Sequence, residues 1–444
     1  MIRKDAHRWT LAVLSFGMVL GSATMAPAQD APITANDVDK PHVARAPAPT
    51  PNADVVRGRY IAIVGDCVAC HTNPSGGKPF AGGYALQTPF GKLVASNITS
   101  DRETGVGRWT ESEFARALRE GIGKQGEHLY PAMPYTSYAK MSDQDVHDLW
   151  LYMKTVPAAH NAVVSNQLPF PFNIRLSLIG WNLMFFNEAH FHPRGDKSEE
   201  WNRGAYLVEA LEHCSACHTP KNLLGGDKAD KAFNGTSLQG WNAPDITTNK
   251  AVGIGGWSTE QIIQYLKIGS NGISVASGPM AEAVTNSTQH LTDPDLHAIA
   301  VYLQSLPDSA ATKPAPVAAG DPIMVHGKRV FEVACAACHA SSGAGINAMA
   351  TTLAGNPGIQ SADADSLVHT VLQGGRGAIT SGNPTGAAMP SFAWNLSDAQ
   401  IAAAITYVRN SWNNAAPIVT EAAVAKTRKA LNLNLVGQRP APTQ

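Results

Sequence analysis

Six cysteines are the residues of this sequence with the clearest capacity for chemistry, because they form three pairs of identical spacing. The pairs belong to Cys-Val-Ala-Cys-His, Cys-Ser-Ala-Cys-His and Cys-Ala-Ala-Cys-His, which end at His71, His218 and His339. Two thiols three residues apart lie on one face of a helical turn, where both can add to the vinyl groups of one porphyrin. The adjoining histidine can then bind the iron. The pattern predicts three covalently bound heme c groups, held by Cys67, Cys70, Cys214, Cys217, Cys335 and Cys338.

Other uses of paired cysteines fit less well. A zinc site of the ribbon type needs two cysteine pairs for one metal and does not need histidine beside cysteine. A thioredoxin-like redox pair does not need to occur three times in one chain. A disulfide framework would scatter its cysteines, whereas these six all fall in the three motifs and none is left over.

Methionine is the expected second axial ligand, because it commonly completes c-type hemes that transfer electrons. Met133 and Met280 both follow the histidine of their motif by 62 residues, and Met389 follows its own by 50. A proline neighbours each of the three, which favours a rigid loop that delivers sulfur to iron. The predicted axial pairs are His71 with Met133, His218 with Met280, and His339 with Met389.

Several other candidate residues fit structural roles better. His147 and His297 recur in only two of the repeats described below and on helix faces, so surface or core roles are favoured over iron ligation. Trp109 and Trp257 either donate indole N–H groups to heme propionates or pack as structural tryptophans. Four methionines without counterparts in other repeats are expected to fill cores: Met141, Met153, Met184 and Met349.

Irons closed on both sides leave no position for substrate or oxygen. We therefore expect a non-catalytic electron-transfer component with no catalytic residue of its own. The sequence also offers no phosphate-binding glycine loop, nucleophile elbow or dinucleotide fingerprint. A peroxidase-like enzyme is an alternative that requires one heme without its methionine.

The helices that hold these motifs are expected to repeat along the chain. Similar helix-forming stretches precede the motifs, at residues 57–61, 203–207 and 327–331. Downstream, residues 105–110 match residues 253–258, and each stretch ends in a capping box that starts a helix. Glycines end those helices at Gly121 and Gly269. Amphipathic helices then close the repeats at Ser142–Lys154, Thr292–Gln304 and Ser397–Trp412, so each repeat begins and ends with helices that can pack together.

Length and composition agree with several globular units. At about 150 residues per domain, 444 residues favour roughly three domains. Hydrophobic residues make up 44% and charged residues 16%, which is a globular composition. The net charge of -1 provides no basic field for nucleic acid.

The first 28 residues are typical of a secretory signal peptide. A basic start at residues 3–8 precedes the apolar stretch Trp9–Leu20, and an Ala-x-Ala site ends at Ala28. Export is the favoured interpretation, and an uncleaved anchor is the alternative.

The connection between the first two repeats is unusually apolar over residues 168–186. Two prolines, Asn173 and Arg175 interrupt it, so it is a poor membrane span. It is either an ordered linker packed between domains or an interfacial or partner-docking segment.

With these motifs in their order, the chain resembles the triheme cytochrome c subunit of membrane-bound quinone-reducing dehydrogenases of bacteria. The types are alcohol dehydrogenase (quinone), gluconate 2-dehydrogenase, fructose dehydrogenase and aldehyde dehydrogenase. The resemblance covers nearly the whole mature chain. It rests on the heme motifs and on their flanks, namely Leu-Tyr-Pro-Ala-Met-Pro at 129–134, Trp-Asn-Arg-Gly at 201–204, Cys-His-Thr-Pro at 217–220, and Met-Pro-Ser-Phe-Ala-Trp at 389–394.

The resemblance implies an electron-transfer subunit beside a large catalytic dehydrogenase subunit that bears pyrroloquinoline quinone (PQQ), FAD or molybdopterin. The acceptor would be ubiquinone, and the place of action the periplasmic face of the bacterial inner membrane. The family's axial ligands fall on the same three histidine–methionine pairs. Some relatives end in a transmembrane helix, whereas residues 421–444 are polar here. Peripheral attachment is therefore expected, through the partner, through residues 174–186 or through the basic tail.

These observations predict a mainly α fold of three tandem class-I-like cytochrome c domains. The expected boundaries are a signal peptide at 1–28, linkers at 29–52 and 308–320, an apolar connection at 158–195, domains at 53–157, 196–307 and 321–415, and a tail at 416–444. An alcohol-oxidising partner is the first choice, with sugar, sugar-acid and aldehyde oxidation as alternatives. The alternative function is a stand-alone soluble periplasmic electron carrier.

Overall fold

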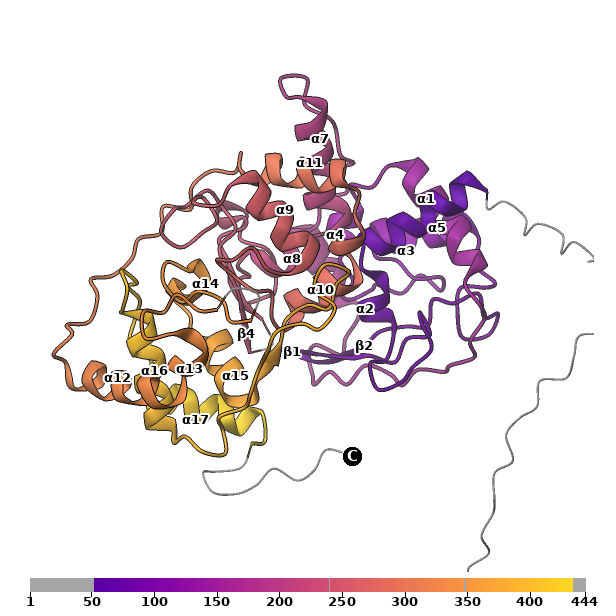
Figure 1. Ribbon diagram of the computed structural model, residues 1–444. Helices are drawn as coiled ribbons and strands as arrows, with labels where there is room; N and C mark the ends of the chain where they lie inside the picture. Colours follow the sequence, from indigo (N-terminus) through magenta and orange to yellow (C-terminus); the bar gives the residue numbers. More distant parts are fainter. Residues whose placement is uncertain (1–51, 239, 347–348, 434–444) are drawn as a thin grey trace, which may run out of the picture. The chain divides into compact units, whose positions relative to one another are not determined.

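The computed structural model describes residues 52–238, 240–346 and 349–433, and this part of the chain is mostly helical (Figure 1). The mainly α prediction is thus confirmed. The described residues all belong to one compact unit, so the division into three domains stays a prediction. The predicted signal peptide and almost all of the linker at 29–52 lie outside the described residues.

The first repeat, residues 53–157, places its heme motif directly after its opening helix. A β-hairpin follows the motif, with Ala85 opposite Val94 and Thr88 opposite Gly91. The elements are α1 (Ala53–Val64), α2 (Cys67–His71), β1 (Ala85–Thr88), β2 (Gly91–Val94), α3 (Glu111–Glu120), α4 (Tyr135–Tyr138) and α5 (Asp143–Thr155). The connection that follows contains α6 (Ser177–Phe185).

The second repeat, residues 196–307, has the same order of opening helix, motif helix, hairpin and closing helix. Its opening helix continues into a π-helical turn at Leu207–Leu211, and 3-10 turns lie at Ala229–Lys231 and Thr288–His290. The elements are α7 (Glu199–Tyr206), α8 (Ser215–His218), β3 (Thr236–Leu238), β4 (Trp241–Ala243), α9 (Thr259–Ile268), α10 (Pro279–Asn286) and α11 (Asp293–Leu303).

The third repeat, residues 321–415, begins with α12 and closes with α16, and α17 follows it. Its two short strands pair Gly375 with Met389 and Arg376 with Ala388. The elements are α12 (Pro322–Ala334), α13 (Ala336–His339), α14 (Pro357–Gln360), α15 (Asp365–Gln373), β5 (Gly375–Arg376), β6 (Ala388–Met389), α16 (Asp398–Arg409) and α17 (Glu421–Ala430).

In every repeat the opening and closing helices pack together, as expected from the sequence: α1 on α5, α7 on α11 and α12 on α16. A glycine in each opening helix permits the close approach. A Cβ atom at Gly58 would lie 1.9 Å from the Asp148 carbonyl oxygen, and one at Gly204 would lie 1.9 Å from the Ala298 carbonyl oxygen. Gly327 has the same role, because its Cβ would lie 2.1 Å from the Ala403 carbonyl oxygen.

The predicted helix boundaries agree closely with the structure. Thr110 and Ser258 both form complete capping boxes at the starts of α3 and α9. Gly121 and Gly269 end those helices with φ angles of 66° and 77°, a left-handed conformation that glycine adopts without a steric penalty. The last closing helix ends at Arg409 rather than at Trp412, which has a φ of 53°.

Reciprocal hydrogen bonds join the first two repeats. The Tyr60 hydroxyl donates to Asp295 Oδ2 at 2.6 Å, and the Tyr206 hydroxyl donates to Asp145 Oδ2 at 2.5 Å. Each tyrosine occupies the same place in its opening helix, and each aspartate the same place in the other repeat's closing helix. One hydrophobic core runs through both repeats. The first two repeats are therefore a paired unit.

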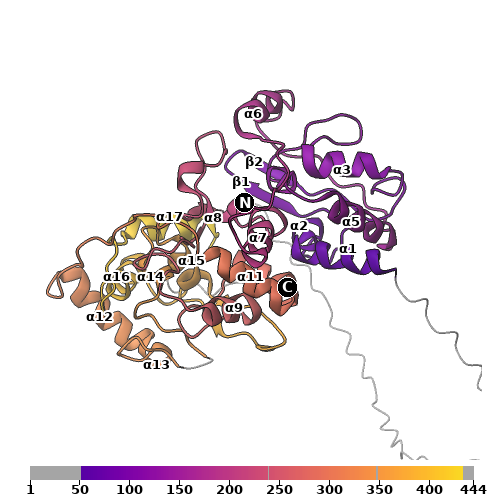
Figure 2. The ribbon, with the colours of Figure 1, turned by 90° about the horizontal axis from the view of Figure 1, so that it is seen from above.

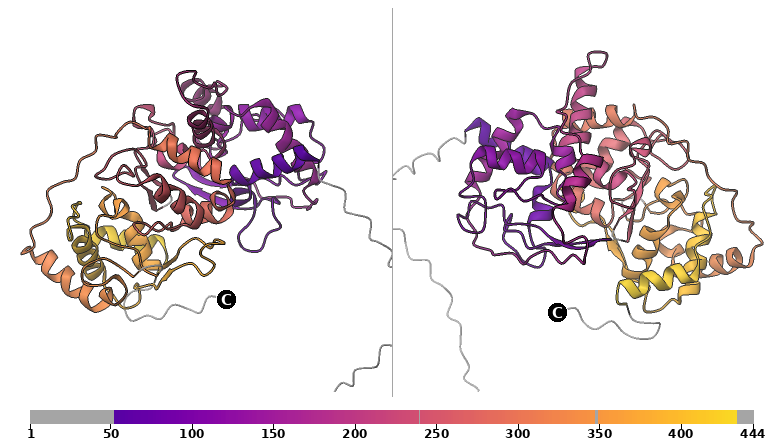
Figure 3. Two further views of the ribbon diagram at one scale, coloured as in Figure 1. Left: turned by 45° about the horizontal axis from the view of Figure 1, so that its top comes forward. Right: turned by 180° about the vertical axis from the view of Figure 1, so that it is seen from behind.

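The third repeat has core clusters of its own, and its helices lie together in Figure 3. Counted from the helix glycine, Arg329 stands where the first two repeats have tyrosine. Counted from the N-cap residue of the closing helix, Gln400 stands where they have aspartate. Part of the segment predicted as a tail is the helix α17, which packs on α15 and α16. Its Arg428 is buried and donates to Asp398 Oδ1 at 2.7 Å.

Candidate functional site

All six cysteines are free, and each motif lies on or against a short helix. Burial raises the pKa of Cys67 to about 12 and that of Cys335 to about 11, so both are neutral thiols at neutral pH. Neutral S–H groups are what addition to a vinyl group consumes. Among the described residues, no cluster of three or more His, Cys, Asp or Glu side chains is arranged to hold a metal ion.

Backbone carbonyl groups orient the histidines of the first two motifs. Nδ1 of His71 lies 2.7 Å from the Ser96 carbonyl oxygen, and Nδ1 of His218 lies 2.7 Å from the Pro244 carbonyl oxygen. Because a carbonyl only accepts, each Nδ1 carries the proton and Nε2 keeps its lone pair. Burial lowers the pKa of both imidazoles, which favours the neutral, metal-binding form.

His339 of the third motif is held less firmly. Its buried Nδ1 has no hydrogen-bond partner among the described residues. Burial lowers its pKa, and the nearby backbone of Thr351 opposes that shift. The donor sets of all three motifs fit a covalently held porphyrin with an axial imidazole, and the first two fit it with the ligand already oriented.

The three predicted methionine ligands lie in three different local structures rather than in one kind of loop. Met133 lies in a turn before α4 and packs against the core that the first two repeats share. Met280 is the second residue of α10, and Met389 lies in strand β6 opposite Gly375. All three side chains are partly buried. The assignment of these sulfurs as iron ligands stays a prediction.

His147 and His297, the rival ligands, lie on the outer faces of α5 and α11 beside carboxylates. Nδ1 of His147 is 2.8 Å from Glu111 Oε1, and Nδ1 of His297 is 2.6 Å from Glu200 Oε1. Such exposed pairs are surface interactions, which agrees with the roles expected from the sequence.

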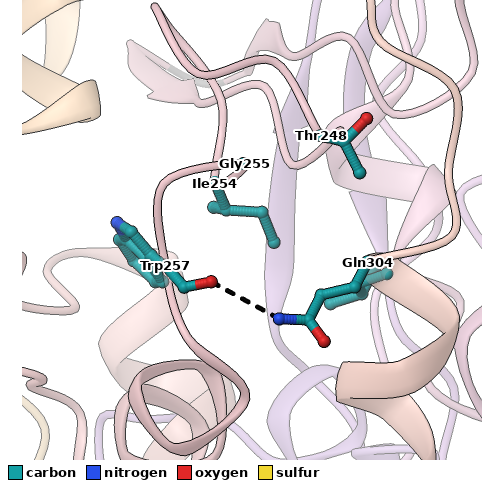
Figure 4. Close-up of a pocket in the computed structure, with 6 residues that line it drawn as sticks. Thr248, Ile254, Gly255, Trp257 and Gln304 are labelled. Atoms are coloured by element: carbon teal, nitrogen blue, oxygen red, sulfur yellow. Dashed lines mark hydrogen bonds between the residues drawn. The ribbon is translucent and has the colours of Figure 1, made fainter.

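Trp257 lines a hollow of about 220 Å³ together with Thr248, Ile254, Gly255, Leu303 and Gln304 (Figure 4). Its carbonyl oxygen accepts from Gln304 Nε2 at 3.4 Å, and its indole nitrogen lies on the side away from Gln304 (Figure 4). That buried nitrogen has no partner among the described residues. An unpaired buried N–H fits the first of the two roles expected for this residue, a donor to a heme propionate. Trp109 packs, partly buried, against the shared core.

Two partly buried carboxyl groups beside the first two motifs were not expected from the sequence. Asp66 precedes Cys67, and Glu212 lies two residues before Cys214. Burial raises the pKa of each to about 8, and the charge of Glu212 adds to the shift of Asp66. Glu212 Oε1 accepts from Ser287 Oγ at 3.2 Å. The recurrence of an acid just before the motif was the available signal, but it looks like an ordinary surface charge.

Comparison with known proteins shows which parts of the chain match a known family. The cytochrome c family model matches residues 55–157 and 324–412. The second motif lies outside both matched ranges, so three hemes rather than two stays a proposal.

Several relatives match over most of the chain. The gluconate 2-dehydrogenase cytochrome c subunit of Pantoea cypripedii is 39% identical over 399 residues, 85% of this chain and 90% of that protein. The alcohol dehydrogenase (quinone) cytochrome c subunit of Gluconacetobacter polyoxogenes is 38% identical over 403 residues, 86% of each chain. The fructose dehydrogenase cytochrome subunit of Gluconobacter japonicus is 36% identical, over 86% of this chain and 84% of that protein. With its heme-attachment helices and oriented imidazoles, the chain belongs to the family of cytochrome c subunits of gluconate, alcohol and fructose dehydrogenases.

Proposed function

We propose that this chain is a triheme electron-transfer subunit that passes electrons from a separate substrate-oxidising dehydrogenase subunit to ubiquinone. The supporting observation is the helix-borne pair of free cysteines followed by histidine, which occurs three times and holds an oriented imidazole at His71 and His218. When bound, each heme supplies an iron that accepts and releases one electron.

In this proposal, the residues of the chain bind the hemes, orient them and keep them near one another. The cysteines would anchor each porphyrin. Nε2 of His71 and His218, whose Nδ1 atoms are held by backbone carbonyls, and the sulfurs of the three predicted methionines would bind the irons. The first two attachment sites adjoin one core, because Cys67 and Cys214 both pack against the hydrophobic core that the first two repeats share. The helix α10, which carries Met280, also contacts α2, which carries Cys67 and Cys70 (Figure 1). This proximity supports a relay between neighbouring hemes.

The donor is a large catalytic subunit with PQQ, FAD or molybdopterin, and alcohol oxidation is the first choice of reaction. The relatives support this proposal because their names place them in alcohol, gluconate and fructose dehydrogenases. Substrate is bound on the other subunit, so residues of this chain do not choose it.

The place of action in this proposal is the periplasmic face of the inner membrane, with export directed by residues 1–28. No helix in the described part of the chain is long and apolar enough to cross a bilayer. We assign attachment to the partner subunit and to the connection around α6, which lies at the edge of the ribbon in Figure 2. In this connection Leu176 is 72% and Leu183 is 84% exposed.

Purification of the native complex tests the proposal. A pyridine hemochrome assay should give three hemes per chain, and a large dehydrogenase subunit should copurify. The complex should reduce ubiquinone when alcohols, gluconate, fructose or aldehydes are supplied in turn. Purification of the chain alone, still able to exchange electrons with other membrane complexes, would instead indicate a stand-alone carrier.

A further inference from the structure

The surroundings of Met280 are built by two repeats. Met280 packs in a small cluster with Ala276, Ala281 and Val284 of its own repeat and with Ala378 of the third repeat. Ala378 is buried. Met133, by contrast, packs against the large core that the first two repeats share. The predicted sixth ligand of the second heme therefore depends on the third repeat for part of its packing.

Trp241 covers the turn that leads into Met280. A Cβ atom at Gly278 would lie 2.6 Å from the Trp241 ring, which is closer than real contacts allow. Gly278 has a φ of 53°, a conformation that favours glycine, and only Pro279 separates it from Met280. The indole ring thus rests directly on the backbone that sets where α10 begins.

The other neighbour of the Trp241 ring belongs to the third repeat. The imidazole of His369 stacks on it with ring centroids 4.1 Å apart and planes inclined by 25°. His369 is buried in α15, and its Nε2 lies 2.6 Å from Gln373 Oε1, which fixes the orientation of the ring. Trp241 therefore lies between the Met280 turn and the helix that leads to the strand pairing with Met389.

Hydrogen bonds on both sides of the stack hold the two repeats in this position. The Asn242 backbone N–H donates to Ser366 Oγ at 2.7 Å, beside Trp241. Farther along α10, the Ile379 backbone N–H donates to Thr285 Oγ1 at 3.2 Å. The third repeat thus contacts both the turn before α10 and the body of that helix.

We propose that Trp241 is a positioning residue through which the third repeat holds Met280 at the iron of the second heme. The inference rests on the proposed heme assignment and adds a role for the contact between repeats. Without the indole, the glycine turn before Met280 loses the ring that covers it and His369 loses its stacking partner. Met280 then leaves the iron more readily, and the second heme loses the raised potential that methionine ligation gives.

The experiment uses the full chain, matured with heme, and compares Trp241→Leu with Trp241→Phe. Trp241→Leu should lower the midpoint potential of one heme and remove one heme's share of the methionine-to-iron charge-transfer band, with the heme content unchanged. Trp241→Phe keeps an aromatic ring on Gly278 and should restore both signals. Trp201→Leu is the matched control, because Trp201 is in the same repeat but packs on Tyr302.

Met280→Leu identifies which heme has changed. The double variant Trp241→Leu/Met280→Leu should show the same potential and band as Met280→Leu alone, because the two changes act on one ligand. If Trp241→Leu does not fold, His369→Leu should give the same spectral and potentiometric change with Trp241 in place, and His369→Phe should restore it.

The outcomes separate the two hypotheses. No change in band or potential in Trp241→Leu, or in His369→Leu, while Met280→Leu alters both, would overturn the role of Trp241 and leave the heme assignment intact. No change in Met280→Leu itself would overturn the ligand assignment. A further shift in the double variant would place the effect of Trp241 at another heme and would also overturn the proposal.

Discussion

Two backbone carbonyls decide the chemistry of His71 and His218. Each accepts the Nδ1 proton, so one tautomer is selected and the other ring nitrogen is left with its lone pair. An imidazole oriented in this way needs little rearrangement to bind iron. Nδ1 of His339 forms no hydrogen bond of normal geometry among the described residues, and only the nearby Thr351 backbone favours its protonated form, so this imidazole is held less firmly than the other two.

Glu212 offers a test of electrostatics at the scale of one residue. Burial raises its pKa to about 8, whereas the unfolded chain should titrate near its ordinary value of about 4.3. The folded protein therefore binds the proton more tightly than the unfolded chain. This stabilisation is complete below the unfolded pKa and is lost as the pH rises through 8.

Because of this group, we expect the melting temperature of the heme-loaded protein to decrease as the pH rises from about 5 to about 9. Glu212→Gln keeps an oxygen that accepts from Ser287 but does not ionise, so its melting temperature should change less over the same range. Thermal unfolding followed by circular dichroism provides the measurement. Glu188→Gln, at an exposed position, is the control. Parallel curves for Glu212→Gln and the unchanged protein would contradict the assigned pKa.

At the scale of the helices, the glycine that brings α1 onto α5 is expected to tolerate no side chain. Gly58→Ala places a methyl group 1.9 Å from the Asp148 carbonyl oxygen, so the two helices must separate. Overpacking of this kind costs about 1–3 kcal/mol of unfolding free energy. Urea unfolding of the heme-loaded protein measures the loss.

Gly256→Ala is the matched control for that substitution, because a Cβ atom there meets nothing within 4 Å. It should leave the unfolding free energy within about 0.5 kcal/mol of the unchanged protein. Equal stabilities for the two variants would show that the contact between α1 and α5 is not as close as the structure indicates.

Local signals in the sequence predicted many of the helix boundaries. The capping residues Thr110 and Ser258, with the glycines that end α3 and α9, give helix boundaries that depend on neighbouring residues alone. Strands of two to four residues, such as β3 and β6, carry no such signal because their pairing is set by the surrounding fold. The start of α10 was a readable signal that was missed, since Pro279 is at a favoured first helical position.

Contacts between distant residues explain what the sequence did not predict at the site. The free cysteines and the histidine that follows them could be recognised from spacing, because the chemistry is local. The buried carboxyl of Glu212 and the stack of Trp241 on His369 depend on how repeats meet. The pattern inside one repeat carries no information on those contacts.

On the scale of the whole molecule, the connection between the first two repeats presents an apolar face while remaining anchored. Tyr135 donates its hydroxyl to Asn182 Oδ1 at 2.7 Å, and the Trp181 indole donates to the Leu224 carbonyl oxygen at 2.9 Å. Leu183, the next residue of α6 after these two anchors, is 84% exposed. One side of this segment is thus packed and the other is open, and the choice between an ordered linker and an interfacial segment stays a prediction.

Leu183→Glu should weaken attachment of the heme-loaded chain to liposomes of inner-membrane lipids. A charge on the exposed side of α6 opposes burial at the lipid boundary, whereas the anchors at Tyr135 and Trp181 stay intact. Cosedimentation with the vesicles measures the bound fraction. Val333→Glu, at another exposed apolar position in the third repeat, is the control. Equal binding by both variants would show that the exposed side of α6 does not contribute, and would leave the partner subunit and the basic tail as the means of attachment.

The two tyrosine–aspartate contacts between the first two repeats bear on the direction of the electron flow that we propose. Because Tyr60 bonds Asp295 and Tyr206 bonds Asp145, the same contact is made once in each direction across the boundary. These contacts therefore do not distinguish one repeat from the other. We expect a difference in potential between the two hemes to come from contacts made by one repeat alone, and the third repeat, which packs beside Met280, is such a neighbour.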